Sequence, residues 1–323
     1  MLFQRVGLCM TERCSAACSI CCFSCSPDRS RRISHEALRF HIRDAADHAE
    51  ISSVGFTGGE ALLDYEEVLE LSRYARSLNL QTTVNTNGFW GEDPELWKPR
   101  LCALREAGLR AVFFSSDPYH QQFVPVEHLR RALELSLALG LQTKVSVLET
   151  ARSNHRGELA TRLGPELSKT LQSAPLLCAG RAERSIPPGD FPAPCAPEKA
   201  LCCFDSTLHV SFDGNLYLCC SQLSTEIPPL ALGRTGETTL REASERMARS
   251  DVTYLLLRRG PGWFYGKAAS RELVSGNGAV HPCRLCRDLI GNAALLDALR
   301  EDIHAEAEAL RLESFFNGLQ AHR

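Results

Sequence analysis

The sequence predicts an α/β protein: a partial (β/α)6 TIM-like barrel, then a small C-terminal domain and a terminal helix. Short apolar and β-branched runs alternate with helical stretches, which is typical of βα units around a parallel sheet. A complete eight-stranded barrel needs about 250 residues, but only roughly 180 are available here, so we expect six strands. Five prolines lie between Ile186 and Pro197. We place the domain boundary there, with a barrel at 1–186 and a second domain at 187–323.

The strands are expected where apolar runs end at polar or turn residues, and the helices where apolar residues recur with helical period. We assign strands to 2–10, 51–57, 80–85, 111–114, 141–148 and 175–178. Helices are expected at 34–49, 65–77, 94–107, 126–139 and 158–163, with Ser34 as N-cap of the first.

The second domain has two clear signals. Asp213-Gly214 lies between the apolar runs 208–212 and 215–219, which predicts a β-hairpin. Residues 292–316 form an amphipathic helix or helix pair, which we interpret as a packing face and not a partner interface.

Bulk composition narrows the class of protein. A net charge of −3 without a strongly basic block argues against a nucleic-acid partner. The sequence shows no secretion signal and no apolar run that could span a bilayer, so we expect a cytoplasmic protein without a membrane partner. Fifteen cysteines in such a chain indicate metal or redox chemistry and not disulfides. The first strand begins almost at residue 1, so we expect no N-terminal leader-binding domain.

The first cysteine cluster has C-x3-C-x2-C spacing, at Cys14, Cys18 and Cys21. Three soft thiolates in one loop suit three irons of a [4Fe-4S] cube and leave the fourth iron open for a small molecule. The alternatives are zinc or ordinary reduced thiols. Zinc usually takes four ligands from two separated pairs, whereas the pairs here, Cys18/Cys21 and Cys22/Cys25, directly adjoin each other.

Polar and glycine residues follow several expected strands. Because the carboxyl ends of barrel strands meet at one face, we expect these residues to surround the cysteine loop. They are Gly58, Gly59, Glu60, Asn85, Ser115, Asp117 and Ser146. Asp117 precedes a proline, so it also fits a simple turn.

The second domain carries further cysteines, which include a late C-x2-C pair. Together with thiols on the hairpin this pair can complete a four-thiolate site, for which structural zinc is the alternative. If Cys219 and Cys220 share one strand, their side chains point to opposite faces. One can then bind metal while the other is a free thiol and a hydrogen-atom donor. An inert buried thiol is the alternative.

These motifs resemble those of the radical S-adenosylmethionine (SAM) enzymes. The signature is C-x3-C-x-hydrophobic-C, with Ile20 as the hydrophobic residue, and a strand that ends in Gly58-Gly59-Glu60. The resemblance implies that the open iron binds the amino and carboxylate groups of SAM, and that Gly-Gly-Glu meets the methionine ammonium. Glycines permit close backbone approach, and an acid accepts from a cationic amine. Ser115 and Asp117 would hydrogen-bond the ribose or carboxylate of SAM, although Asp117 fits a contact with the peptide equally well.

The same resemblance implies a C-terminal domain of the SPASM or shorter twitch type with an auxiliary [4Fe-4S] cluster. For this cluster we expect the ligands Cys203, Cys219, Cys283 and Cys286, with Cys195 or Cys202 as replacements for Cys203. An electron donor such as flavodoxin or ferredoxin is expected as a partner.

Several stretches resemble a narrower group, the epipeptide-type peptide epimerases. They are CCFSCSP at 21–27, FTGGE at 56–60, LDY at 63–65, NGFWG at 87–91, the YH and FV pairs within 119–124, DG at 213–214 before CCS at 219–221, and WF at 263–264. The resemblance implies that a 5′-deoxyadenosyl radical abstracts an α-hydrogen from a ribosomal precursor peptide. A thiol, here Cys220, then returns a hydrogen from the opposite face. Cys219 would be its cluster-binding neighbour.

Two other functions stay open at this point. Related folds form thioether or carbon–carbon crosslinks in peptides, and a non-catalytic iron–sulfur or zinc module would use the same thiols. Peptide recognition is expected at the barrel mouth and the C-terminal region.

Overall fold

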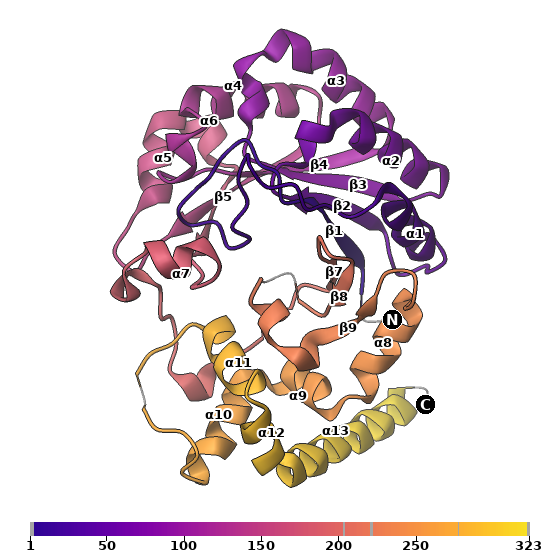
Figure 1. Cartoon of the computed structure of the whole chain (residues 1–323), viewed down its shortest axis with the longest axis vertical. Coiled ribbons are helices and arrows are strands. Elements are labelled where there is room, and N and C mark those ends of the chain that lie inside the picture. The colour runs from indigo at the N-terminus through magenta and orange to yellow at the C-terminus, as the bar shows by residue number, and fades with distance from the viewer. Residues whose placement is uncertain (1–2, 203, 220–221, 277, 322–323) are drawn as a thin grey trace.

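The computed structural model describes residues 3–202, 204–219, 222–276 and 278–321 (Figure 1). In this part of the chain the strands form one sheet in the order β6-β5-β4-β3-β2-β1-β7-β8-β9. The barrel strands are β1 (Arg5–Thr11), β2 (Ser53–Gly58), β3 (Gln81–Thr86), β4 (Leu109–Ser115), β5 (Gln142–Glu149) and β6 (Leu171–Pro175). The C-terminal strands are β7 (Thr207–Val210), β8 (Asn215–Tyr217) and β9 (Ala231–Arg234).

Helices follow the barrel strands and cover the outer face of the sheet (Figure 1). In the barrel they are α1 (His35–Ala46), α2 (Tyr65–Ser77), α3 (Pro94–Glu106), α4 (Val126–Ala138), α5 (His155–Leu163), α6 (Pro165–Ser168) and α7 (Arg181–Ser185). The C-terminal helices are α8 (Leu240–Arg249), α9 (Asp251–Arg259), α10 (Pro261–Ser270), α11 (Pro282–Ile290), α12 (Ala293–Ala298) and α13 (Arg300–Ala321). Short 3-10 turns include η1 (Ala61–Asp64), η2 (Phe89–Glu92), η4 (Pro188–Asp190) and η6 (Gln222–Glu226). As predicted, Ser34 caps α1: its side chain accepts from the Ala37 amide at 3.2 Å.

The alternation of side chains along the strands separates the core from the site. Val54, Val84, Val112 and Val145 are fully or almost fully buried in the hydrophobic core, which also contains the apolar faces of the helices. Their neighbours in sequence point to the other face of the sheet, toward the inside of the barrel. Asn85, Ser115 and Ser146 belong to this inner set. Strands β4 and β5 pair Ser115 with Ser146 directly, so the sheet register brings these polar groups together.

The barrel is open, as the sequence predicted. Strands β1 to β6 are parallel, and β6 lies at one edge of the sheet. On the other side β7 pairs with β1 in parallel, with Arg5 opposite Thr207, and β8 and β9 continue antiparallel. The predicted Asp213-Gly214 hairpin is confirmed: Gly214 takes φ +76° and its amide donates to the Ser211 carbonyl at 2.9 Å. The C-terminal hairpin therefore extends the barrel sheet, and the domain boundary at 186/187 stays a prediction.

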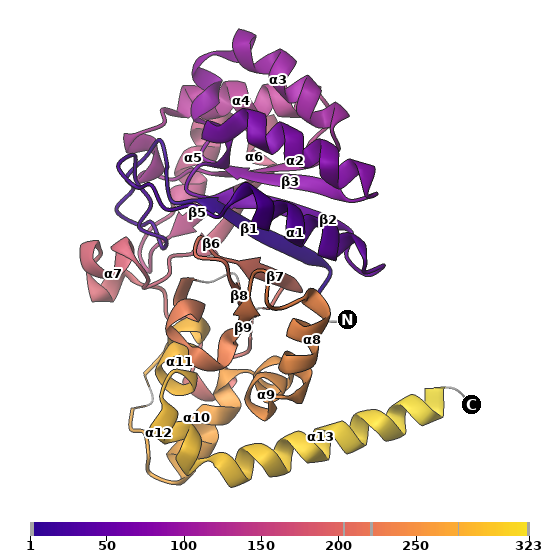
Figure 2. The ribbon, with the colours of Figure 1, turned by 45° about the vertical axis from the view of Figure 1, so that its right-hand side comes forward.

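Three details differ from the sequence prediction. The sixth strand is Leu171–Pro175 and not 175–178, because residues 172–175 are polar, small or proline and form an exposed edge, whereas the apolar run at 176–178 lines two cavities. Strand β8 ends at Tyr217, two residues before Cys219, so strand alternation does not decide where the Cys219 side chain points. Helices α8 to α11 were not predicted. The terminal segment is a helix pair, α12 and α13, and α13 extends away from the body of the protein (Figure 2).

No helix in the described part of the chain is both long and apolar enough to cross a membrane.

Candidate functional site

A cavity of about 210 Å³ lies at the carboxyl ends of the barrel strands. The three predicted ligands Cys14, Cys18 and Cys21 line it from the loop after β1. Five of the predicted cofactor-binding residues line it from the strand ends and the turn after β2, namely Gly58, Gly59, Asn85, Ser115 and Ser146. The structure thus brings together the thiols and most of the polar residues that sequence reasoning had singled out.

Two glycines allow the end of β2 to contact the cysteine loop closely. A Cβ atom on Gly59 would overlap the carbonyl oxygen of Arg13, and one on Gly58 would press on the Thr11 carbonyl. Gly58 also takes φ +131°, which side-chain-bearing residues rarely adopt. The amides of Gly59 and Glu60 donate to the carbonyls of Thr11 and Arg13 at 2.7 and 2.9 Å. The motif therefore closes the base of the loop that carries the thiols.

Burial and hydrogen bonding shift the pKa values of the three cysteine thiols. Burial raises the pKa of Cys14 and of Cys18 to about 12. The pKa of Cys21 is instead lowered to about 6, because Cys25 hydrogen-bonds to its sulfur. Thiols release their protons on binding a metal, and three thiols that line one cavity fit an iron–sulfur cluster. Cys25 also lines this cavity and packs with Cys9 and Phe212.

Glu60 is fully buried and its carboxylate points into the protein. It accepts from the Leu62 amide at 3.2 Å, from the Thr86 hydroxyl at 3.0 Å and from the Asn87 amide at 2.8 Å. Burial raises its pKa to about 7, and these hydrogen bonds oppose a larger rise. Asn87 in turn donates to the Ser15 hydroxyl at 2.9 Å. In the described structure Glu60 thus positions the end of β3 against the cysteine loop from behind the cavity wall.

Asp117 is also fully buried, in the turn after β4. Its carboxylate accepts from the amides of Tyr119 and His120 at 3.0 and 3.1 Å and pairs with His120 Nδ1 at 2.9 Å. Burial alone would raise its pKa, but the bonds from His120 and Tyr119 outweigh burial and lower it. The turn that the sequence allowed for Asp117 is therefore present, and His120 is the residue that lines the cavity. A contact of Asp117 or Glu60 with SAM stays a prediction.

The cavity is also lined by residues outside the predicted cofactor-binding set, which include Thr86, Asn87, His120 and Leu148. Thr86 and Asn87 continue the run that begins at Asn85, Leu148 lies two residues after Ser146, and His120 lies three residues after Asp117. All four residues lie at the end of a barrel strand or shortly after it, and this position in the sequence is the signal that could have identified them.

A second cavity, of about 240 Å³, lies in the C-terminal part and is mainly apolar apart from its thiols. Cys219, Cys283 and Cys286 of the predicted ligand set line it, and so does Cys202. Burial raises the pKa of Cys286, and the neighbouring thiols Cys202 and Cys283 raise it further. Cys195 is not among the lining residues, and its thiol donates to the Val280 carbonyl at 3.5 Å. Among the described cysteines, the geometry favours Cys202 over Cys195 as the fourth thiol.

Two predicted residues, Cys203 and Cys220, lie outside the described residues. Cys22 lines both cavities, so the two thiol sites are neighbours.

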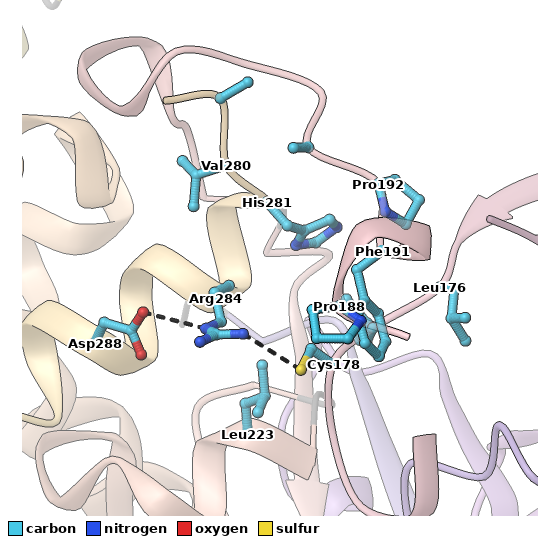
Figure 3. A pocket seen from close by; sticks show the side chains of 13 residues that line it. Leu176, Cys178, Pro188, Phe191, Pro192, Leu223, Val280, His281, Arg284 and Asp288 are labelled. Carbon is cyan, nitrogen blue, oxygen red and sulfur yellow. Dashed lines mark hydrogen bonds and ion pairs between the residues drawn. The ribbon is translucent and has the colours of Figure 1, made fainter. Parts of the chain in front are cut away.

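Figure 3 shows a third cavity, an outer cleft of about 310 Å³. It shares Leu177 and Leu223 with the second cavity. Its wall combines Phe191 and other apolar side chains with His281 and Arg284. Arg284 points between Asp288, at 3.2 Å, and the Cys178 sulfur, at 3.4 Å (Figure 3). The cleft is thus formed by the segment after β6, by the proline-rich linker and by the start of α11.

Within the described residues, no three His, Cys, Asp or Glu side chains form a group suited to a single metal ion.

Comparison with known proteins gives a consistent result. Residues 8–136 match the model of the Radical SAM superfamily. The chain is 26% identical over 270 residues to the putative peptide biosynthesis protein YydG of Bacillus subtilis (strain 168). The matched region covers 82% of this chain and 83% of that protein.

Solved structures resemble the whole fold. The structure of native anSMEcpe with bound AdoMet has a TM-score of 0.55 and 15% identity, and the match covers 95% of this chain and 99% of that one. The structure of native anSMEcpe with bound AdoMet and Kp18Cys peptide also has a TM-score of 0.55 and 15% identity, with 94% and 99% covered. At this identity the likeness supports the fold alone.

Proposed function

We propose that this chain, which carries a radical SAM domain and is a radical SAM enzyme, converts L-residues to D-residues in a ribosomally synthesised peptide. The observation that carries the proposal is the similarity to a putative peptide biosynthesis protein over 82% of this chain. The motifs typical of peptide epimerases and the thiol-lined second cavity support it further. The finer assignment, epimerisation, is our own.

The first cavity fits a [4Fe-4S] cluster with SAM. Cys14, Cys18 and Cys21 would bind three of its irons, because all three thiols line one cavity. When bound, the cluster and SAM supply a 5′-deoxyadenosyl radical that takes a hydrogen atom from an α-carbon of the peptide. Gly58 and Gly59 would let the methionine part of SAM approach the backbone, and Asn85, Ser115 and Ser146 would offer it hydrogen bonds.

Cys220 would return the hydrogen. Its S–H bond breaks and a new C–H bond forms on the opposite face of the α-carbon, which inverts the residue and leaves a thiyl radical. One electron and one proton then restore the thiol. We expect the electron to come from a donor such as a flavodoxin or ferredoxin, through an auxiliary [4Fe-4S] cluster in the second cavity. Cys219, Cys283 and Cys286 would bind that cluster with Cys202 or Cys203.

The peptide would bind in the outer cleft, which shares Leu177 and Leu223 with the second cavity. The second cavity in turn shares Cys22 with the first. The apolar wall of the outer cleft, with Arg284 and His281, suits a segment that carries both apolar and polar side chains.

The test is incubation of reduced enzyme with SAM and the precursor peptide in deuterated and in ordinary water. The proposal predicts one deuterium per inverted residue in deuterated water and an unchanged peptide mass in ordinary water. A product that has lost two hydrogens would identify a crosslinking or thioether-forming enzyme instead. Absence of 5′-deoxyadenosine would identify a non-catalytic module.

A further inference from the structure

A short helix after the last barrel strand contacts the cysteine loop in a way that the proposed chemistry does not use. This helix, α7 (Arg181–Ser185), lies beside the indigo loop in both Figure 1 and Figure 2. Ala182 of α7 and Ile186, which directly follows the helix, pack in one buried cluster with three residues of the loop, namely Ala16, Cys18 and Ile20. Residues more than 150 positions apart in sequence thus share one small core.

The backbone approach at this contact is close. Gly180 takes φ +58°, and a Cβ atom there would overlap the carbonyl oxygen of Cys22. The Arg181 amide donates to the Cys21 carbonyl at 2.9 Å. A side chain at position 180 would therefore push α7 away from the loop.

The Arg181 side chain then joins two points of the loop. Its Nη1 donates to the Cys18 carbonyl at 2.6 Å, and its Nη2 donates to the Cys25 carbonyl at 2.8 Å. The planar guanidinium is suited to such a two-pronged contact, which a single ammonium cannot reproduce. The contact also places the positive charge of the guanidinium beside the loop that carries Cys21.

The other side of α7 reaches the C-terminal thiol site. Glu183 pairs with Arg287 Nη1 at 3.2 Å, and the same nitrogen lies 3.6 Å from Glu226. The Arg287 side chain is only 14% exposed and directly follows Cys286 on α11. This five-residue helix therefore contacts both the first cysteine loop and the residue that follows Cys286.

We propose that α7 is a strap, in which Arg181 is a positioning residue that holds the cysteine loop closed and Glu183 links the loop to the second thiol site. The strap sets the loop geometry before any metal is bound. It also places a fixed positive charge beside the first site, which favours the more negative, reduced form of a cluster there.

Limited trypsin digestion of the metal-free full-length chain tests the strap without any cluster. Cleavage after the exposed Arg29 in the loop, followed by mass spectrometry, reports how often the loop opens. Arg181→Met should speed this cleavage about tenfold or more, because two charge-assisted hydrogen bonds are lost. Arg184→Met is the matched control: it removes an exposed arginine of the same helix and should leave the rate unchanged. Arg181→Lys, which can keep one of the two bonds, should fall between them.

The reduction potential of the reconstituted enzyme is the second readout, measured on the signal that responds to added SAM. Arg181→Met should make this potential more negative, whereas Arg181→Lys and Arg184→Met should stay close to the unaltered chain. Equal trypsin cleavage in Arg181→Met and Arg184→Met would overturn the strap, and so would a potential that does not move or moves upward. The strap rests on the proposed function only for this second readout. A chain that binds no cluster would refute the proposed function, while the trypsin result would still decide the strap.

Discussion

Single buried polar residues decide how the parts of this protein are held together. Glu60 collects three donors from two elements, and through Asn87 it supports Ser15 in the cysteine loop. His41, on α1, links the barrel to the C-terminal part of the chain. Its Nε2 lies 2.8 Å from the Thr235 hydroxyl, which in turn donates to the Gly214 carbonyl at 2.8 Å. Among the residues that the structure describes, none hydrogen-bonds to the buried His41 Nδ1, so the neutral ring with its proton on Nε2 fits the site.

The pH dependence of stability should report on His41. Burial lowers its pKa to about 4, below the unfolded value of about 6.5. The unfolded chain then binds a proton that the folded chain excludes, so the stability is fully present above about pH 6.5 and is lost on acidification toward pH 4. We expect His41 to lower the free energy of unfolding by about 2 kcal/mol between pH 7 and pH 5.

Urea unfolding of the metal-free chain at pH 7, 6 and 5 checks this value. His41→Gln keeps a donor toward Thr235 but cannot titrate, so its loss of stability over that range should be smaller by the same amount. Thr235→Val is the control: it should lower stability at every pH but keep the pH dependence of the unaltered chain. Equal pH dependence in His41→Gln and the unaltered chain would contradict the account.

At the scale of elements, the turn after β2 joins the sheet to the cysteine loop. We expect Gly59→Ala to prevent that junction, because the added Cβ would meet the backbone carbonyl of Arg13, which cannot move without opening the loop. Gly189→Ala is a matched control, since its Cβ would meet nothing within 4 Å. The prediction is that anaerobic reconstitution yields clearly less bound iron in Gly59→Ala than in Gly189→Ala. Normal iron content in Gly59→Ala would show that the close approach is not required.

The elements that the sequence predicted best are those with local signals. Most of the five predicted barrel helices have N-caps or glycine stops, and the hairpin has the Asp213-Gly214 turn pair, so they were located to within a few residues, whereas the short helices α6 and α7 were missed. Strand β6 was placed four residues too late because its exposed edge lacks apolar residues, while the apolar run at 176–178 packs between cavities. Such a contact depends on distant segments and leaves no periodic pattern.

At the scale of the whole molecule, the site residues also divide into those that the sequence could predict and those that depend on contacts between distant segments. Cys14, Cys18, Cys21 and the strand-end residues could be predicted because a parallel barrel brings its strand ends to one face. Arg181 and Cys202 could not. The role of Arg181 depends on a contact with carbonyl groups more than 150 residues away in sequence. Cys202 and Cys195 are distinguished only by the folded structure, in which Cys202 lines the second cavity and Cys195 contacts the Val280 carbonyl.

The C-terminal thiols give a prediction at this scale. Two [4Fe-4S] clusters would require about eight irons per chain. Cys286→Ser and Cys202→Ser should each lower the iron content and alter the spectrum of the second cluster, while Cys195→Ser should leave both unchanged. Cys203→Ser is included because the sequence alone favoured that position. If Cys203→Ser reduces the iron and Cys202→Ser does not, the ligand assignment changes to Cys203.

The proposed reaction requires the first cavity to be the catalytic centre. The most direct measurement is the formation of 5′-deoxyadenosine and methionine from SAM by the anaerobically reconstituted, chemically reduced chain. We predict equal amounts of both products from the unaltered chain, none from Cys18→Ser, and continued formation by Cys25→Ser, because Cys25 lies outside the C-x3-C-x2-C signature although it lines the same cavity. The account would be contradicted if the unaltered chain formed no 5′-deoxyadenosine, or if Cys18→Ser formed as much as the unaltered chain.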